Sequence, residues 1–437
     1  MADDTGKLFS CPLMQAVRDR FLQVAHDAHG RDRLYFDNAG GSFRLASAID
    51  CFARIDAVPD NTERHHAAAV ELQDVQARGV ADLRIILNAT GGSVFASSTA
   101  SSAMFDMVRA IAENVPGGNM VTTVLEHPSA FDAMTLYAQR LGKELRVARS
   151  NPETGGVDVD EIVGLVDPDT CLLNVIYASN ISGAKLDIEE VVRQARSINP
   201  NLYIVVDAVQ HAPHGLIDLQ KTPVDGINIA PYKFFGCRGS GFAWLSDRAA
   251  RLPHHKLGAK QPDVWDLGST SPWQFAVVTA IVDYVCWLGG QSSRAEMTER
   301  RALFVQGMQA IGLHERALLA RLLDGTSGAP GLRKMAHVDV FLDHPDLSKR
   351  DLILAIGFDH LGCAEAVSEY EKRGVIVYER VASSLYSKRM LESFGLEGAI
   401  RVSPLHCNSE ADVARFLAIT QEISEAFAGS ASHASAR

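Results

Sequence analysis

The chain has 437 residues, of which 47% are hydrophobic and 22% charged, and it carries a formal net charge of −11 at pH 7. This length suits two packed units rather than one small domain, and the negative charge argues against nucleic acid or an anionic membrane as the main partner. No apolar run predicts a membrane span, and the acidic start of the chain, MADDTGK, is unlike a signal peptide. We therefore expect a cytoplasmic protein.

The first predicted element is a helix over residues 13–25, which we expect to pack against the C-terminal unit. The middle of the chain then alternates short apolar runs with helical patterns. Buried strands are predicted over residues 119–127, 171–180, 201–210 and 226–230, with a crossover helix over residues 187–198. Strands that alternate with helices indicate an α/β domain with a mainly parallel central sheet covered by helices.

The pattern changes after about Trp287. A long helical stretch, residues 292–323, is followed by predicted strands over residues 335–343, 373–381 and 399–405. This order indicates a smaller α+β domain. We therefore divide the chain into a large domain, residues 34–290, and a small domain formed by residues 1–33 and 291–427. Residues 428–437, rich in alanine and serine, are expected to form a disordered tail.

Three of the predicted strands end in polar residues of different chemistry, His127, Asn180 and Asp207. In open α/β sheets, ligands bind beyond the carboxyl ends of the strands. Strands must end in polar residues somewhere, which explains one or two of these positions. Chance explains three such residues less well. Together they favour a binding site at this edge of the sheet.

Small hydroxyl residues gather where an apolar segment passes into a predicted helix, within residues 94–112. They are Ser98, Thr99, Ser101 and Ser102. The free N–H groups at a helix N-terminus favour a phosphate, whereas a single serine or threonine there is commonly an N-cap. One cap needs only one hydroxyl, so we predict an anion site and keep simple capping as the alternative.

The segment NIAPYKFFGCRG, residues 228–239, places Lys233 between a tyrosine and two phenylalanines. Desolvation by apolar neighbours lowers the pKa of an amine and makes it a better nucleophile and base. The alternative is an ordinary lysine whose stem lies along apolar surface. Taken singly, Asp207 and Gln210 also have ordinary explanations, as a turn residue and a surface residue.

The stretch from residue 205 to residue 241 resembles the cofactor segment of class V aminotransferase-fold enzymes. These depend on pyridoxal 5′-phosphate (PLP) and include cysteine desulfurases, selenocysteine lyases, kynureninases and isopenicillin N epimerase. The family pattern is an aspartate, a glutamine three residues later and a lysine further on, here Asp207, Gln210 and Lys233. The resemblance runs from about Tyr35 to Phe416. It implies a PLP-dependent transferase fold (fold type I) and a homodimer with shared active sites.

The resemblance also implies a role for each motif residue. Lys233 would hold the PLP aldehyde as a Schiff base and serve as the catalytic base. Asp207 would pair with the pyridinium nitrogen, and Gln210 would donate to the ring 3′-oxygen. His127, in the segment LEHPSAFDAM, would stack on the ring and counts with Lys233 as a catalytic residue.

Other family positions are filled as well. For the cofactor, the resemblance points to Ala100 and Ser101 in the phosphate cup, Asn180 near the 3′-oxygen, Tyr232 as a phosphate contact, and Ser269 or Thr270 reaching the phosphate of the partner subunit. For the substrate, it points to Arg401 as the carboxylate-binding arginine, to Asn180, and to the backbone of Ala39 and Gly40. Tyr232 could equally pack as an ordinary aromatic residue.

The sequence departs from the family where the reaction is decided. Many desulfurases carry serine and histidine at the positions of Ala230 and Tyr232. The segment before Arg401 has no cysteine that could take sulfur as a persulfide, and Cys363 and Cys407 lie outside that position. Cys237 is close to Lys233 in sequence, although a small packed residue is the simpler explanation. The seven cysteines show no C-x-x-C pair, so we expect no metal site.

These features predict a PLP-dependent enzyme that acts on the amino group and Cα of an amino acid. The favoured reaction is β-elimination, that of a C–S lyase or desulfurase-like enzyme without the persulfide cysteine. A class V aminotransferase or an amino-acid epimerase is the alternative. A PLP-fold protein that is no longer an enzyme, or a binding module, is a third hypothesis, against which the intact Asp207, Gln210 and Lys233 argue. Substrate choice is expected to reside in the loop SSLYSKRM, residues 383–390.

Overall fold

The computed structural model describes residues 6–59, 62–292 and 298–434. Its main element is a seven-stranded sheet with the strand order β2-β8-β7-β6-β5-β3-β4. The strands are β2 (Ser93–Ser97), β3 (Asn119–Thr123), β4 (Glu144–Ala148), β5 (Thr170–Ile176), β6 (Tyr203–Asp207), β7 (Gly226–Ile229) and β8 (Gly241–Leu245). All four strands predicted in this region are present, each with fewer residues than expected. Strand β8 runs antiparallel to both of its neighbours, β2 and β7, and the other strand pairs of this sheet are parallel, so the sheet is mainly parallel as predicted.

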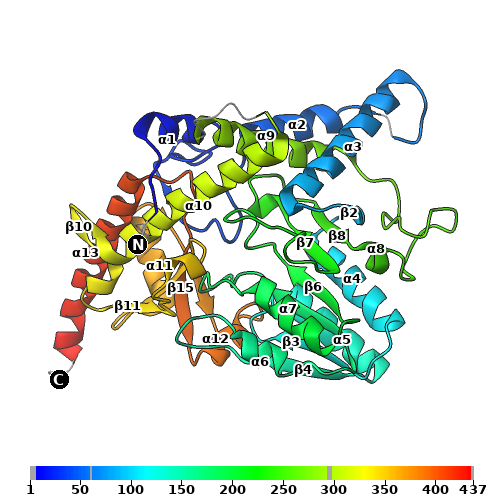
Figure 1. Cartoon of the computed structure of the whole chain (residues 1–437). Coiled ribbons are helices and arrows are strands. Elements are labelled where there is room, and N and C mark those ends of the chain that lie inside the picture. The colour runs from blue at the N-terminus through cyan, green and yellow to red at the C-terminus, as the bar shows by residue number, and fades with distance from the viewer. Residues whose placement is uncertain (1–5, 60–61, 293–297, 435–437) are drawn as a thin grey trace.

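Helices cover both faces of this sheet (Figure 1). Alternate strand residues point to opposite faces, and two separate apolar clusters result. One contains α4 (Ala100–Asn114) and α5 (Pro128–Leu141). The other contains α3 (Ala67–Leu87), α6 (Val159–Val163), α7 (Ile188–Ile198) and α9 (Pro272–Ser292). The remaining helices of this region are α2 (Ala46–Asp56) and α8 (Asp247–Ala250).

The small unit is built on a four-stranded antiparallel sheet with the order β11-β12-β15-β14. Its strands are β11 (Val338–Phe341), β12 (Leu354–Phe358), β14 (Tyr378–Val381) and β15 (Gly398–Val402), and its helices are α10 (Arg300–Asp324), α11 (Cys363–Lys372), α12 (Lys388–Ser393) and α13 (Glu410–Ala434). Short pairs are formed by β1 (Leu34–Tyr35) with β13 (Val375–Ile376) and by β9 (Gly325–Thr326) with β10 (Ala329–Pro330). The predicted strands at residues 335–343, 373–381 and 399–405 correspond to β11, β13 with β14, and β15.

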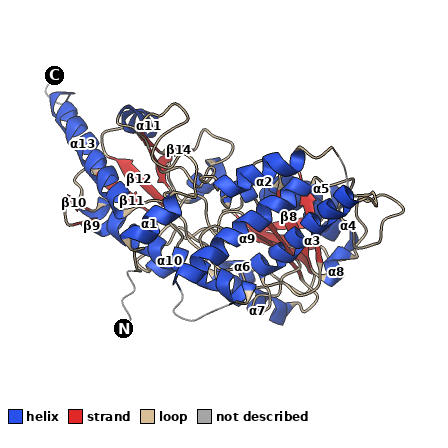
Figure 2. Ribbon diagram, turned by 90° about the horizontal axis from the view of Figure 1, so that it is seen from above, coloured by secondary structure: helices blue, strands red, loops and turns tan. Residues whose placement is uncertain are grey.

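Helix α10 links the two units (Figure 2). Its first half, with Phe304 and Met308, packs into the core of the large unit, whereas Leu318 and Leu322 pack into the core of the small unit. The expected long helix over residues 292–323 is therefore α10 together with the end of α9, and residues 293–297 of that prediction lie outside the described residues.

Three expectations about helices need correction. The N-terminal helix α1 (Cys11–Arg18) is shorter than the predicted 13–25, because Phe21 forms a bridge with Leu45 and Gln23 adopts a positive φ of 57°. Helix α13 runs to Ala434, past residue 428 where a disordered tail was expected to begin. Adding alanines to an existing helix has no nucleation cost, and residues 435–437 lie outside the described residues.

Helix α9 is the third correction, because no membrane-length apolar segment was expected. Residues Pro272–Gln291 meet the length and hydropathy of a membrane span, with a mean hydropathy of 1.2. However, 67% of that window is buried inside the protein, and the helix packs against α2, α3 and α10. The apolar character of α9 is thus that of a core helix.

Candidate active site

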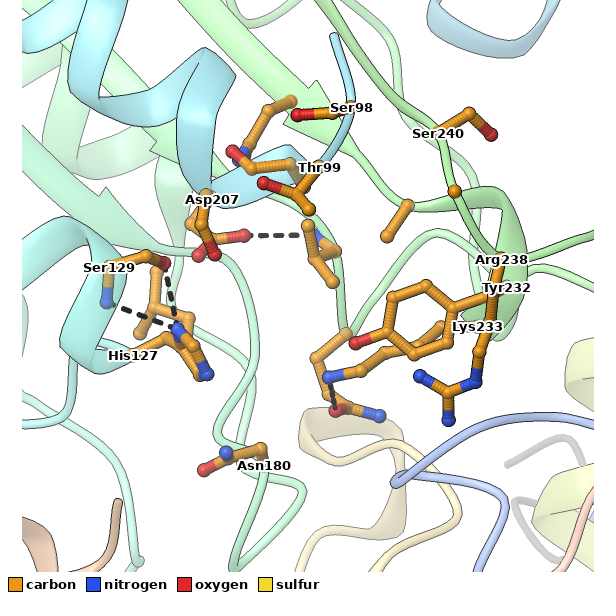
Figure 3. A pocket seen from close by; sticks show the side chains of 18 residues that line it. Ser98, Thr99, His127, Ser129, Asn180, Asp207, Tyr232, Lys233, Arg238 and Ser240 are labelled. Carbon is orange, nitrogen blue, oxygen red and sulfur yellow. Dashed lines mark hydrogen bonds between the residues drawn. The ribbon is translucent and has the colours of Figure 1, made fainter. Parts of the chain in front are cut away.

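Two adjoining cavities open at the carboxyl ends of β5, β6 and β7. The inner cavity has a volume of about 360 Å³ and is lined by residues from these strands, from the start of α4 and from the loop after β7 (Figure 3). The outer cavity has a volume of about 290 Å³ and reaches the small unit. Four residues line both cavities, namely His127, Asn180, Tyr232 and Lys233. The site lies beyond the carboxyl ends of the strands as expected, but only Asp207 ends a strand: β3 ends four residues before His127, and β5 ends four residues before Asn180.

Lys233 lies at the boundary of the two cavities. Strand β7 ends at Ile229, and a short 3-10 helix, Pro231–Lys233, turns the lysine toward the inner cavity. Lys233 is 9% exposed, and its Nζ donates a hydrogen bond to Oε1 of Gln210 at 3.3 Å. Burial, with a further contribution from Arg401, lowers the pKa of Lys233 to about 8. This amine is therefore partly neutral at physiological pH, as a nucleophile or base needs to be.

Asp207 is the last residue of β6 and only 4% exposed. Its Oδ1 accepts a hydrogen bond from the Val209 N–H at 3.0 Å. Burial raises the pKa of Asp207, while the Val209 N–H and the charge of Lys233 oppose that rise. A buried carboxyl group with one protein donor is suited to pair with a cationic N–H of a ligand.

His127 caps the N-terminus of α5. Its Nδ1 accepts a hydrogen bond from the Ser129 N–H at 3.2 Å and lies 2.7 Å from Ser129 Oγ (Figure 3). Burial, followed by the charge of Lys233, lowers the pKa of His127 to about 3. The ring is consequently neutral, and since Nδ1 accepts the amide proton, its own proton is on Nε2. A neutral ring that lines the inner cavity is suited to stacking on an aromatic ligand.

The N-terminus of α4 forms the other end of the inner cavity. Thr99 is the N-cap and accepts a hydrogen bond from the Ser102 N–H at 3.0 Å, so simple capping accounts for this hydroxyl. The N–H groups of Ala100 and Ser101 have no intrahelical acceptor at a helix N-terminus. Ser240 Oγ, which lines the same cavity, is buried without a partner among the described residues. This end of the cavity is thus suited to a phosphate.

A close contact between β8 and α4 fixes this phosphate-binding end. A Cβ atom added to Gly241 would lie 2.0 Å from the Ala100 nitrogen and 2.3 Å from the Thr99 carbonyl carbon. Only glycine lets the start of β8 approach the start of α4 so closely.

The inner cavity fits PLP. It combines an anion site at α4, a buried carboxylate at Asp207, a neutral ring at His127 and an amine at Lys233. The Oδ1 atom of Asn180 is also buried without a partner among the described residues. The volume lies within the usual range for cofactor sites. The predicted residues Ala100, Ser101, Asn180, Gln210 and Tyr232 all line this cavity.

Arg401 lies in the outer cavity, on β15. It is 4% exposed, its Nη2 forms an ion pair with Asp37 Oδ1 at 2.6 Å, and its Nη1 donates to the Asn180 carbonyl at 3.3 Å. Ala39 and Gly40 line the same cavity. The predicted substrate residues are therefore brought together, with Asp37 holding the arginine in place.

Thr270 and Ser269 lie outside both cavities. Thr270 accepts hydrogen bonds from Gln76 at its carbonyl and at Oγ1, and Ser269 Oγ donates to Glu63 at 2.7 Å. The role expected of them concerns a partner subunit, and it stays a prediction.

All seven cysteines are among the described residues, and none lines either cavity. Cys237 and Cys407 are buried, and burial raises the pKa of each thiol. Burial also raises the pKa of Cys363. These thiols are poor nucleophiles in this environment.

Several cavity residues were not identified from the sequence. Ser129 follows His127 in a motif where a side-chain cap could have been expected. Arg238 lies over the Tyr232 ring at 4.4 Å and follows Lys233 within the quoted segment. Asp37 and Arg380 had no local signal. In the loop 383–390, Tyr386 lines the outer cavity, whereas Arg389 donates to the Glu126 carbonyl at 2.7 Å and supports the backbone beside His127.

Comparison with known proteins identifies the family. A model described as Aminotransferase class-V matches residues 34–416. The chain is 25% identical over 343 residues to a probable cysteine desulfurase of Xylella fastidiosa (strain 9a5c), covering 72% of this chain and 82% of that protein. It is also 25% identical over 343 residues to a cysteine desulfurase of Serratia proteamaculans (strain 568), covering 73% and 79%.

Among solved structures, the apo cysteine desulfurase from Thermococcus onnurineus NA1 superposes with a TM-score of 0.75 at 17% identity, over 90% of this chain and 95% of that one. This likeness confirms the predicted fold, a PLP-dependent transferase fold with a mainly parallel sheet. The family match covers most of the chain, including every cavity residue discussed above. The chain therefore belongs to the aminotransferase class-V family, and it is a PLP-dependent enzyme.

Proposed function

We propose that this enzyme binds PLP in the inner cavity and acts on the amino group and Cα of an amino acid bound in the outer cavity. The observation that carries the proposal is the position of Lys233, a buried amine with a lowered pKa that lines both cavities. The favoured reaction is β-elimination from a substrate with a sulfur leaving group.

The residues that would hold PLP are those that line the inner cavity. Asp207 would pair with the ring nitrogen, His127 would stack on the ring, and Gln210 and Asn180 would donate to the 3′-oxygen. The N–H groups of Ala100 and Ser101, with Tyr232, would hold the phosphate. Bound PLP supplies an electron sink that stabilises negative charge at the substrate Cα.

The protein's own groups would bind the substrate and move its proton. Arg401 would hold the α-carboxylate by a bidentate contact, for which Asp37 must give up part of its ion pair. Ala39, Gly40 and Asn180 would line the substrate. Lys233 Nζ, partly neutral at physiological pH, would take the proton from Cα. Because His127 stays neutral, it adds no charge that would compete with these contacts.

Two observations bear on the choice of reaction. The relatives named above are cysteine desulfurases, which favours cleavage of a C–S bond. Neither cavity is lined by a cysteine, which argues that sulfur does not leave as a protein persulfide. The second observation also supports the alternative reactions, transamination by a class V aminotransferase or epimerisation of an amino acid.

We further propose a cytoplasmic homodimer in which Thr270 or Ser269 reaches the phosphate site of the partner subunit. The proposal is supported by the family resemblance and by the position of both residues outside the cavities of their own chain. The substrate is a small amino acid, and neither nucleic acid nor membrane is a proposed partner, in keeping with the net charge of −11.

The experiment that tests the function has two stages. Purified protein mixed with PLP should develop a visible absorbance band that is absent in Lys233→Ala, and protein that takes up no PLP would refute the proposal. Incubation with amino acids then separates the reactions. A keto acid and ammonia formed without an added oxoacid indicate a lyase, strict dependence on an oxoacid indicates transamination, and inverted stereochemistry alone indicates epimerisation.

A further inference from the structure

Arg380 is a second buried arginine in the outer cavity. It lies on β14, is 6% exposed, and lines the same cavity as Arg401 and Lys233. Its Nη2 donates to the main-chain carbonyl of Tyr386 at 2.8 Å, whereas its Nε is buried without a partner in the described part of the chain. No carboxylate of the described residues forms an ion pair with it. Burying a guanidinium with one hydrogen bond and no ion pair lowers the stability of the fold.

The strand register places the two arginines side by side. Tyr378 is directly opposite Arg401, and Arg380 is opposite Ala399, in the antiparallel pair β14–β15. Arg380 is therefore the diagonal neighbour of Arg401 on the same face of the sheet. Diagonal neighbours of this kind are about 7–8 Å apart at Cα. Two anionic groups of one short ligand could engage both guanidinium groups across such a spacing.

The charges in the outer cavity are unbalanced. Lys233, Arg380 and Arg401 all line it, and Asp37 is the only acid among the described lining residues. Asp37 already pairs with Arg401 and keeps 19% of its side chain exposed. Burial lowers the pKa of Arg380 to about 10, and the charge of Arg401 adds to the effect, while Asp37 and Tyr378 oppose it. The α-carboxylate of a substrate would pair with one arginine and leave the other without an anionic partner.

We propose that Arg380 binds a second anionic group, carried by the substrate side chain, so that the enzyme selects α-amino acids with acidic side chains. This inference rests on the proposed function for the α-carboxylate at Arg401. A purely structural role, in which Arg380 only anchors the loop at Tyr386, would use one of its nitrogens and leave Nε buried and unused. The specificity determinant is thus on β14 rather than on the loop 383–390 alone.

The test compares two ligands of equal length that cannot react, succinate with two carboxylates and butyrate with one. Their dissociation constants are measured by calorimetry on the PLP-loaded enzyme. We expect succinate to bind about tenfold or more tightly than butyrate, the effect of one added charged hydrogen bond. Arg380→Gln should abolish this preference by weakening succinate alone, and Arg380→Lys should restore part of it.

Lys372→Gln is the matched control, because it removes the same charge from an exposed position at the end of helix α11, outside both cavities. It should leave the preference unchanged. If Arg380→Gln weakens the binding of succinate and butyrate equally, the α-carboxylate binds at Arg380 and the inference is wrong. Equal binding of succinate and butyrate to the unaltered enzyme would also refute it. The comparison of succinate with butyrate on the unaltered enzyme needs no variant, so it tests the inference even if Arg380→Gln does not fold.

The same titration separates this inference from the proposed function. If the protein takes up no PLP, the proposed function fails, but succinate and butyrate can still be compared on the cofactor-free protein. If PLP is bound and the succinate preference is absent, the function stands and the role of Arg380 fails. In turnover assays on the loaded enzyme, Arg380→Gln should raise KM for acidic amino acids far more than for their amides.

Discussion

Replacing Lys233 with methionine should stabilise the cofactor-free protein, because the buried amine is a cost to folding. Its folded-state pKa is about 8, below the ordinary value of 10.5. Between these two values the unfolded chain binds more protons than the folded one, so stability rises with pH across this window. Below about pH 8 the full penalty is present, and above about pH 10.5 it is absent.

The size of the effect follows from the structure. Each pKa unit corresponds to about 1.4 kcal/mol, so the fall from 10.5 to about 8 costs the folded state about 3 kcal/mol at neutral pH. Methionine keeps the apolar stem but loses the hydrogen bond to Gln210, which contributes about 1 kcal/mol. Lys233→Met should therefore gain about 2 kcal/mol near pH 7, and this gain should vanish near pH 10.

The assay is urea unfolding of cofactor-free wild type and variant at a series of pH values, with equal m-values as the condition for comparison. Lys388→Met, at an exposed position of α12, is the control and should change stability by less than about 0.5 kcal/mol at every pH. A Lys233→Met variant that is destabilised to the same extent at all pH values would refute the reasoning, because it would show that the lysine is not desolvated in the folded state.

Three further outcomes follow from the site. Asp207→Asn should still bind PLP, seen by its visible band, while the turnover number falls by about a hundredfold or more, since a neutral amide cannot pair with a charged ring nitrogen. Gly241→Ala should weaken PLP binding in a fluorescence titration by about tenfold or more, because its Cβ would lie 2.0 Å from the Ala100 nitrogen and displace the phosphate site. Burial raises the pKa of Glu126 to about 8, so the folded protein binds the extra proton between about pH 4.5 and pH 8 and wild-type stability falls across that window. Glu126→Gln should gain stability over wild type as pH rises through it in urea unfolding, and a constant difference would contradict this.

Much of the large unit could be predicted because its signals are local. Buried parallel strands appear as short apolar runs, and the carboxyl ends of such strands meet at one edge of the sheet. The sequence alone therefore predicts that His127, Asn180 and Asp207 lie close together. The direction of β8 could not be predicted in this way, since GFAWL is equally apolar whichever way it runs and its neighbours β7 and β2 decide its orientation.

Arg380 and Asp37 show where the sequence signal ends. Arg380 occupies one position in a strand of mixed polarity. Its place beside Arg401 is set by the register between β14 and β15, which joins residues about twenty positions apart. Asp37 acquires its role by contact with Arg401, which lies far along the chain. Neither relation leaves a periodic or compositional trace. The residues that decide specificity were therefore harder to identify than those that bind the cofactor, which form a motif.

The same imbalance of charge connects folding with function in this protein. The two cavities are lined by the buried cations Lys233, Arg380 and Arg401, against the acids Asp37 and Asp207. Hydrophobic residues of similar volume would make the fold more stable at these positions. The phosphate of the cofactor and the carboxylates of a substrate are the groups that would compensate the excess positive charge. The cost of burying Arg380 and Arg401 is thus offset by their affinity for the anionic groups of a substrate, whereas the cost at Lys233 keeps its amine partly neutral for bond formation with the cofactor.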